Sequence, residues 1–184
     1  MDQKYQIVRK ALSLDTCKLI KDTLKITKDA SYIHNNVPQS DTKYFGDEQC
    51  PDSYVNYGHS ITEALLLTVQ PFVENFTKLK VYPTYSYSRI YWKNSILDKH
   101  TDRPSCQFSA TVCIDNDPEP WAIYMGGTEV FLEPGDLVCY KGCEVEHWRD
   151  PYEGNQQIQV FLHYVDQQGP YSNLKFDGRP ALGV

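Results

Sequence analysis

Hydrophobic and polar residues alternate along much of the chain after residue 80, which is the pattern of half-buried β-strands. The longest such stretch is VYPTYSYSRIYW, residues 81–92. Every second residue of a strand shares a face. One face of this stretch carries Tyr85, Tyr87, Arg89 and Tyr91. Further strand patterns follow in CQFSATVCID, WAIYM, TEVFL, LVCYKG and QIQVFLHYV. Residues 133–136, Glu-Pro-Gly-Asp, suit a type II turn. The pattern predicts about eight short strands.

The first 79 residues show mainly helical periodicity. After a short strand at 5–12, residues 13–26 predict a helix with Ser13 as its N-cap. The apolar residues that recur there at helical spacing are Leu14, Cys17, Ile20 and Leu24. Residues 28–57 are polar and rich in tyrosine and predict a long irregular loop. Residues 60–75 predict a second helix, which Pro71 is expected to kink or end.

Helices followed by a run of strands predict an α+β fold. The expected architecture is a jelly roll, with the N-terminal helices packed on one sheet of an antiparallel double sheet. We expect a single domain over 1–184, with the core at about 80–166 and helical support from 1–79.

The composition argues against two classes of function, broad nucleic-acid binding and membrane insertion. With 18 basic and 24 acidic residues the net charge is −6, and no basic run is visible, which argues against a broad nucleic-acid surface. The N-terminus lacks an apolar signal region, and no stretch is long enough to span a membrane, so a cytoplasmic location is expected.

The six cysteines form no Cys-x-x-Cys pair. Without a signal peptide they are expected to be buried or idle thiols. A zinc site on Cys139, Cys143 and His147 is an alternative, but Gly142 and the strand pattern argue against the helix that would align these side chains.

His100 and Asp102 stand two positions apart at the end of a predicted strand, so their side chains point to the same side. Two imidazoles and one carboxylate form the facial triad of non-haem Fe(II) oxygenases, which leaves coordination positions open. The third ligand must come from elsewhere, and His147 is the candidate because the mouth of a jelly roll brings distant strands together. Of the other histidines, His34 and His59 are expected to face solvent. His163 is expected to be a strand residue with a hydrogen-bond partner.

With these features the chain resembles the Fe(II)/2-oxoglutarate-dependent dioxygenases, in the prolyl-4-hydroxylase-like branch. The resemblance covers most of the chain and is strongest from about residue 82 to 165. The motifs that carry it are ALSLDTCKLI as the opening helix, Tyr91 nine residues before His100, the His100-Thr-Asp102 motif, MGGTEVFLEPGDLVCYKG, and the EHW that contains His147.

The resemblance implies a double-stranded β-helix and a ferrous ion on His100, Asp102 and His147 as the catalytic centre. It implies 2-oxoglutarate as co-substrate, with Tyr91 among its contacts, O2 as oxidant and ascorbate as an additional reductant. The implied reaction hydroxylates an unactivated C–H bond and releases succinate and CO2.

The chain departs from the family after the distal histidine. In the family a Lys or Arg usually follows there and pairs with the far carboxylate of 2-oxoglutarate, but residues 155–159 here read Asn-Gln-Gln-Ile-Gln. A buried carboxylate without a cation is costly. Arg89, which shares a strand face with Tyr91, is the first candidate cation. Arg149 is the second, and Gln159 is expected to donate a neutral hydrogen bond.

The substrate is less defined. Arg103 follows the metal Asp, and Trp148 and Arg149 follow the metal His, so these residues are expected on the rim of the mouth. The residues expected to line an approach groove are Tyr32, Tyr44, Tyr54, Tyr57 and Trp121. An aromatic rim that contains arginine suits a peptide or a small acidic molecule, so a peptide or small-molecule substrate is expected. Family analogy suggests a peptidyl proline or another amino-acid residue.

Two other functions stay open at this stage. One is a non-catalytic jelly-roll binding or structural protein with a vestigial metal site. The other is a cupin-type metal enzyme that uses no keto acid. Ferrous binding together with 2-oxoglutarate would distinguish the oxygenase from both.

Overall fold

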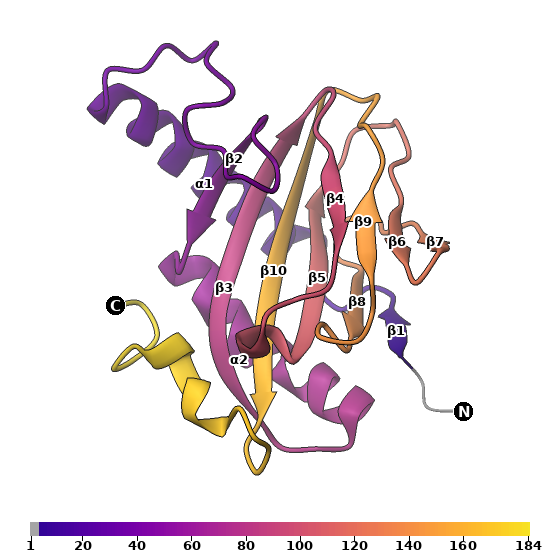
Figure 1. The fold of residues 1–184 in the computed structure, drawn as a ribbon. Coiled ribbons are helices and arrows are strands. Elements are labelled where there is room, and N and C mark those ends of the chain that lie inside the picture. The colour runs from indigo at the N-terminus through magenta and orange to yellow at the C-terminus, as the bar shows by residue number, and fades with distance from the viewer. Residues whose placement is uncertain (1–3) are drawn as a thin grey trace.

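Two antiparallel sheets form the core of the computed structural model, which describes residues 4–184 (Figure 1). In spatial order the large sheet consists of β1 (Tyr5–Val8), β8 (Leu137–Tyr140), β5 (Phe108–Asp115), β10 (Gln156–Asp166), β3 (Val81–Trp92) and β2 (Ser53–Tyr57). The small sheet consists of β4 (Leu97–His100), β9 (His147–Arg149), β6 (Ile123–Met125) and β7 (Thr128–Val130). The predicted jelly roll is therefore confirmed.

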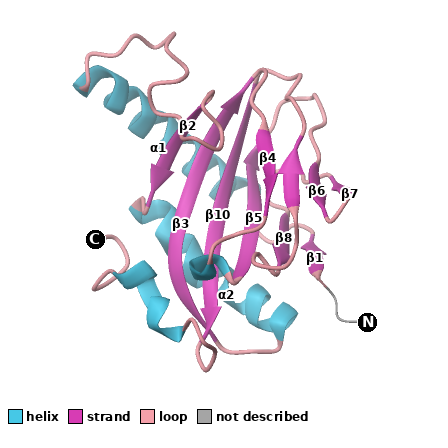
Figure 2. Cartoon of the chain, viewed as in Figure 1, coloured by secondary structure: helices cyan, strands magenta, loops and turns pink. Residues whose placement is uncertain are grey.

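Two helices, α1 (Leu14–His34) and α2 (Ser60–Thr77), cover the face of the large sheet that points away from the small sheet (Figure 2). Ser13 caps α1 as expected, since its hydroxyl accepts a hydrogen bond from the Thr16 N–H at 3.1 Å. The residues that α1 buries are Cys17, Ile20, Leu24 and Tyr32, whereas Leu14 is exposed. No helix within the described residues combines the length and the apolar character needed to cross a membrane.

Strand β10 separates the hydrophobic core from the interior between the sheets, and almost all of it is buried. On one face, Ile158, Val160, Leu162 and Tyr164 pack into the core beneath the helices. On the other face, Gln157, Gln159, Phe161 and His163 point between the two sheets. Polar side chains on a strand buried on both faces indicate that the inter-sheet space is more than a packing interface.

Three sequence expectations need correction. α1 runs to His34, beyond the predicted end at residue 26, and Asn35 caps it by donating to the Ser31 carbonyl at 3.1 Å. The predicted loop at 28–57 also contains β2, which is held by pairing along β3. α2 continues through Pro71 to Thr77.

Local contacts explain why α2 continues through Pro71 and why His59 does not simply face solvent. Proline deprives the carbonyl four residues earlier of its partner. Here that carbonyl belongs to Leu67, which is 60% exposed, so water can replace the lost bond. His59 does not face solvent alone, because its Nδ1 caps α2 by accepting from the Ile61 N–H at 3.3 Å and its Nε2 contacts the Thr27 hydroxyl at 3.1 Å.

The tail after β10 is ordered and ends beside β3. It contains the 3-10 segment η2 (Ser172–Gly178), drawn in yellow in Figure 1. Arg179 anchors it through an ion pair of 2.5 Å with Glu63, whose side chain is 2% exposed, and through a hydrogen bond of 3.1 Å to the Thr84 carbonyl.

Asp136 fixes the predicted type II turn to the N-terminal strand. Gly135 has the positive φ of 92° that this turn requires, and the Asp136 N–H donates to the Glu133 carbonyl at 2.8 Å. The Asp136 carboxylate accepts from the Lys10 N–H at 2.9 Å and from Arg9 at 2.7 Å. Burial alone would raise the pKa of Asp136, but these hydrogen bonds outweigh it and lower the pKa.

We expect Asp136→Asn to lower the free energy of unfolding at pH 7 by about 1–3 kcal/mol, because the Arg9 guanidinium and the Lys10 N–H lose the buried, charged acceptor that they share. A lowered native pKa means that the stabilisation is full above the pKa of the unfolded chain, about 3.9, and is lost as the pH falls. Urea unfolding at pH 7 and at pH 3 measures both effects. An Asn variant that is equally destabilised at the two pH values would contradict the charge argument.

Candidate metal centre

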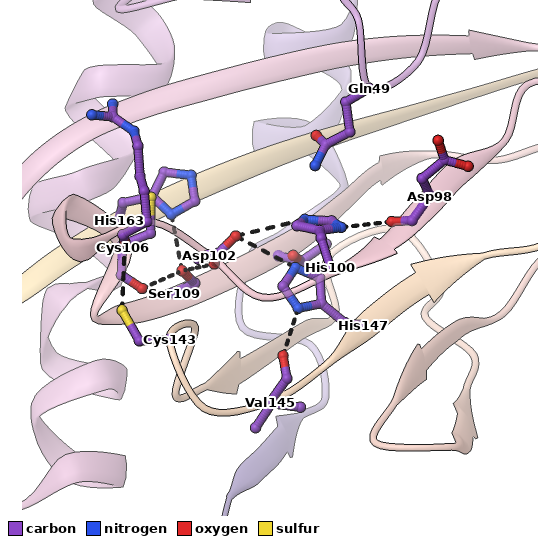
Figure 3. Close-up of polar contacts among 12 residues, drawn as sticks. Gln49, Asp98, His100, Asp102, Cys106, Ser109, Cys143, Val145, His147 and His163 are labelled. Atoms are coloured by element: carbon purple, nitrogen blue, oxygen red, sulfur yellow. Dashed lines mark hydrogen bonds and ion pairs between the residues drawn. The ribbon is translucent and has the colours of Figure 1, made fainter.

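Three side chains, from β4, from β9 and from the segment that directly follows β4, converge between the sheets (Figure 3). His100 ends β4 and lies directly opposite His147, the first residue of β9, and Asp102 follows two residues after His100. The Asp102 Oδ1 lies 3.7 Å from the His100 Nε2 and 3.6 Å from the His147 Nε2. Metal–ligand bonds of about 2.1 Å allow two ligand atoms up to about 4.2 Å apart, so one ion can contact all three.

Backbone carbonyls orient both imidazoles. His100 Nδ1 lies 2.6 Å from the Asp98 carbonyl, and His147 Nδ1 lies 2.8 Å from the Val145 carbonyl. A carbonyl only accepts, so each Nδ1 carries the proton and each Nε2 presents a lone pair to the site. Burial also lowers the pKa of His147, which favours the neutral ring that binds metals.

The Asp102 carboxylate is held from its other side. Its Oδ2 accepts from the Ser109 hydroxyl at 2.9 Å, and its backbone N–H donates to the Gly142 carbonyl at 2.9 Å. A Cβ at position 142 would lie 2.4 Å from the Asp102 Oδ2 and 2.1 Å from the Cys106 carbonyl, so only glycine fits there. These supports fix Asp102 facing the two imidazoles.

His163 lies behind Ser109 and is not part of the triad. Its Nδ1 is 2.9 Å from the Ser109 hydroxyl. Because that hydroxyl donates its proton to Asp102, His163 Nδ1 must donate to it. Burial lowers the pKa of His163 to about 4, so the ring is neutral. The expectation of a strand histidine with a hydrogen-bond partner is confirmed.

Other metal-ligand groupings are weaker. Among residues 4–184 a second group of ligand atoms, from Asp102, Cys106 and His163, shares Asp102 with the triad. Burial raises the pKa of Cys106, and its sulfur contacts the Tyr85 hydroxyl at 3.1 Å, so it does not offer a thiolate. Cys139 is fully buried in the core beneath the helices, which removes the zinc alternative. The cysteines are free thiols, and all except Cys143 are buried.

The triad opens into a cavity of about 420 Å³. This volume suits a small ligand or one residue of a peptide. The residues that line it are Asp47 and Gln49 from the loop before β2, Arg103 beside Asp102, and Tyr57, Tyr85, Tyr87, Tyr140 and Phe161 from the large sheet. Tyr140 and the buried Thr111 contact each other through their hydroxyls at 3.3 Å.

Arg89 already has a carboxylate partner. Its side chain is 2% exposed and lies 2.5 Å from Asp47, which also accepts from the Tyr87 hydroxyl at 2.6 Å. Burial alone would raise the pKa of Asp47, but the Arg89 charge and the Tyr87 hydrogen bond outweigh it and hold the pKa below its usual value. Tyr91 is fully buried, with its hydroxyl 3.5 Å from Arg89.

Arg149, by contrast, is a buried cation without an acidic partner among the described residues. It lies two positions after His147 on β9, so the two side chains share a face. One guanidinium nitrogen donates to the Trp121 carbonyl at 2.9 Å, while Nε has no partner in the described chain. Burial lowers the pKa of Arg149. Both amide atoms of Gln159 and the Gln157 Oε1 are buried and similarly unpaired within residues 4–184.

The predicted substrate residues separate into two groups. Arg103 and Tyr57 line the cavity. Trp148 instead stacks on Tyr124 with ring centroids 4.8 Å apart, under Lys99, and does not line the cavity. Trp121 packs against buried aromatic rings and donates to the Asp150 carbonyl at 2.7 Å.

The other tyrosines proposed for the groove do not line the cavity. Tyr32 and Tyr54 pack in the core with Phe45, and Tyr44 is an exposed neighbour of the Phe45 ring.

Comparison with known proteins identifies the fold. No family model and no curated protein sequence matches the chain. AviO1 from Streptomyces viridochromogenes superposes with a TM-score of 0.69 at 16% identity, covering 92% of each chain. HygX from Streptomyces hygroscopicus, solved with nickel and 2-oxoglutarate, gives 0.66 at 11% identity over 91% of this chain and 84% of its own. A viral collagen prolyl hydroxylase from Paramecium bursaria Chlorella virus-1, solved with 2-oxoglutarate, gives 0.64 at 10% identity over 88% and 96%.

The chain has the fold of the 2-oxoglutarate/Fe(II) oxygenases. The fold expected from the resemblance is therefore confirmed. A prolyl-4-hydroxylase from Pseudomonas putida is among the structures that share it, with a TM-score of 0.64 at 14% identity. Likeness at identities this low establishes the architecture and not the chemistry, which depends on the chain's own side chains.

Ser109 allows a direct test of the metal centre. We expect Ser109→Ala to weaken metal binding about tenfold or more, because hydrogen-bond partners of metal ligands typically contribute about 10–100-fold in affinity. A titration with Ni²⁺, monitored by tryptophan fluorescence, measures the dissociation constant for Ni²⁺. Ser86→Ala is the matched control, since Ser86 is buried in the same sheet but bonds to Thr62. Equal affinities in the two variants would rule out the support that we assign to Ser109.

Proposed function

We propose that this protein is an Fe(II)- and 2-oxoglutarate-dependent dioxygenase that hydroxylates an unactivated C–H bond. The observation that carries the proposal is the triad itself. Two imidazoles, each with Nδ1 bound to a backbone carbonyl, present Nε2 to one carboxylate oxygen at 3.6–3.7 Å. This donor set suits Fe(II) with open coordination positions.

When bound, the metal and 2-oxoglutarate would supply the oxidation, releasing succinate and CO2 as O2 is consumed. The chain's own residues would hold these groups and shape the cavity. His100, Asp102 and His147 would hold the ion, while Ser109 and Gly142 would keep the carboxylate in place. The adjoining cavity would hold the co-substrate and the group to be oxidised.

For the far carboxylate of 2-oxoglutarate we propose Arg149, assisted by Gln159. The sequence favoured Arg89, but Asp47 already neutralises that side chain. Arg149 shares the face of His147 and has no acidic partner among the described residues, and the Gln159 amide has no hydrogen-bond partner there. A buried cation without a counter-charge and a buried amide without hydrogen bonds are costly unless a ligand completes them. Tyr91 packs edge-on against Trp121, and the Arg149 guanidinium lies over the same Trp121 ring at 4.7 Å, so Tyr91 is a neighbour of the proposed cation.

By analogy with the prolyl hydroxylases that share this fold, we propose a peptidyl proline or another amino-acid residue as the group oxidised. The aromatic wall around the triad supports such a choice, because Tyr85, Tyr87 and Phe161 offer flat apolar surfaces for an aliphatic ring or side chain.

Anaerobic addition of Fe(II) and 2-oxoglutarate tests the function. We expect a weak visible charge-transfer band that requires both components, and slow succinate release once O2 is admitted. A screen of prolyl peptides and free amino acids then identifies compounds that stimulate succinate release. Absence of both the band and Fe(II) affinity would favour the non-catalytic binding protein, and O2 consumption without 2-oxoglutarate would favour the cupin-type enzyme.

A further inference from the structure

Arg103 occupies a position that would face any substrate in the cavity. It directly follows the metal ligand Asp102, lines the cavity, and keeps 53% of its side chain exposed. Its guanidinium lies over the Tyr85 ring at 4.7 Å and within 3.2 Å of the Ser105 hydroxyl. These contacts hold the cation in one orientation at the mouth, which is what recognition of an anion requires.

The chain itself places a carboxylate on this cation. Asp177, in the C-terminal segment, accepts from Arg103 at 2.8 Å and from the Tyr57 hydroxyl at 2.7 Å. Tyr57 and Arg103 both line the cavity and are far from Asp177 in sequence. Burial alone would raise the pKa of Asp177, but the hydrogen bonds from Arg103 and its neighbours lower it, so the side chain is charged. Arg103 and Tyr57 thus form a carboxylate cradle.

The backbone that delivers Asp177 is strained. Phe176 and Asp177 both have φ of 56°, in the left-handed region that side chains with a Cβ disfavour. This conformation costs free energy for residues with a Cβ, more for Phe176 than for Asp177, because aspartate tolerates the left-handed region better. Beyond the strained pair, Arg179 and its ion pair with Glu63 anchor the segment independently of Asp177. The carboxylate can therefore leave the cradle without release of the whole segment.

We infer that this cradle is a binding subsite for a carboxylate of the substrate, and that Asp177 fills it until the substrate arrives. The inference rests on the proposed function, because it assigns the substrate class of the same cavity. The substrate is then a carboxylic acid whose apolar part lies against Tyr85, Tyr87 and Phe161, with its anionic end on Arg103. Relief of the backbone strain partly offsets the loss of the internal ion pair.

The probe for this subsite is 3-phenylpropionate, which joins an aromatic ring to a carboxylate, and its neutral amide is the matched control. Calorimetry on protein loaded with Ni²⁺ and 2-oxoglutarate keeps the probe away from the metal. We expect Asp177→Ala to bind 3-phenylpropionate at least tenfold more tightly than the wild type, with no gain for the amide. In Arg103→Gln/Asp177→Ala the gain should disappear.

Asp177→Asn is the second variant. It removes the charge but keeps the shape of the side chain, so it remains informative if alanine disorders the C-terminal segment. Equal affinity of the wild type and both Asp177 variants would overturn the inference, and so would a gain that survives loss of Arg103. Binding of Ni²⁺ and 2-oxoglutarate is measured first, and its failure counts against the proposed function alone. The probe is then titrated into the metal-free protein, which still tests the cradle.

The source of the carboxylate is resolved in the same titrations. A carboxylate of this kind belongs to a free small acid or to the C-terminus of a peptide. Tighter binding of N-acetylglycyl-phenylalanine than of 3-phenylpropionate would assign it to a peptide, and the reverse order to a small acid. Both results support the cradle.

Discussion

Replacing Asp102 by alanine is expected to abolish 2-oxoglutarate turnover, with succinate formation falling about a thousandfold or more. The reason is that its Oδ1 lies within 3.7 Å of both imidazole nitrogens, so its loss removes the only anionic ligand of the triad. His147→Ala should have the same effect. Succinate release and the anaerobic charge-transfer band measure turnover and binding separately, and circular dichroism checks the fold.

His34→Ala is the matched control for these variants, because His34 is exposed at the end of α1. This variant should convert 2-oxoglutarate at the rate of the wild type. Turnover retained in Asp102→Ala or His147→Ala would count decisively against this metal centre. Loss of the band together with an intact fold would instead assign the defect to metal binding.

The second large effect concerns the co-substrate. We expect Arg149→Gln to raise the KM for 2-oxoglutarate about 100-fold, since removing one partner of a buried charge pair costs about 2–5 kcal/mol. Arg149→Lys keeps the charge and should recover part of the loss. Steady-state succinate release over a range of 2-oxoglutarate concentrations gives KM for each variant.

Arg89→Gln is the comparison that decides between the two cations. It breaks the ion pair with Asp47, so we expect a lower unfolding temperature and a smaller change in KM. If Arg89→Gln raises KM more than Arg149→Gln does, Arg89 is the cation, and the assignment of Arg149 from its lack of an acidic partner is wrong.

The sequence predicted the fold where local patterns are strong. The alternation in 81–92 gave β3 with its observed bounds, and the Pro-Gly turn before Asp136 has the expected geometry. The spacing of His100 and Asp102 also follows from strand alternation. Strand β2 escaped prediction because its pairing along β3, and not its own sequence, holds it in an extended form.

The choice of cation illustrates what a sequence alone leaves undetermined. Arg89 and Arg149 both have suitable positions on predicted strands. What distinguishes them is Asp47, which comes from a polar loop more than 40 residues before Arg89 and has no local signature. Ser109 and Gly142 were likewise missed, since their contacts with Asp102 depend on tertiary packing. The only feature of the sequence that pointed to this support was Gly142 itself, a glycine next to a predicted strand.

Because His100 and His147 sit across from each other on adjacent strands, an ion between them would also fasten β4 to β9. These strands share only a short, irregular ladder. A bound metal ion would thus stabilise the small sheet. Removing the ion would destabilise that sheet, while the large sheet would stay packed under the helices. Chelation is then expected to increase hydrogen exchange first at these two strands, so the proposed ion would contribute to the stability of the small sheet as well as to the reaction.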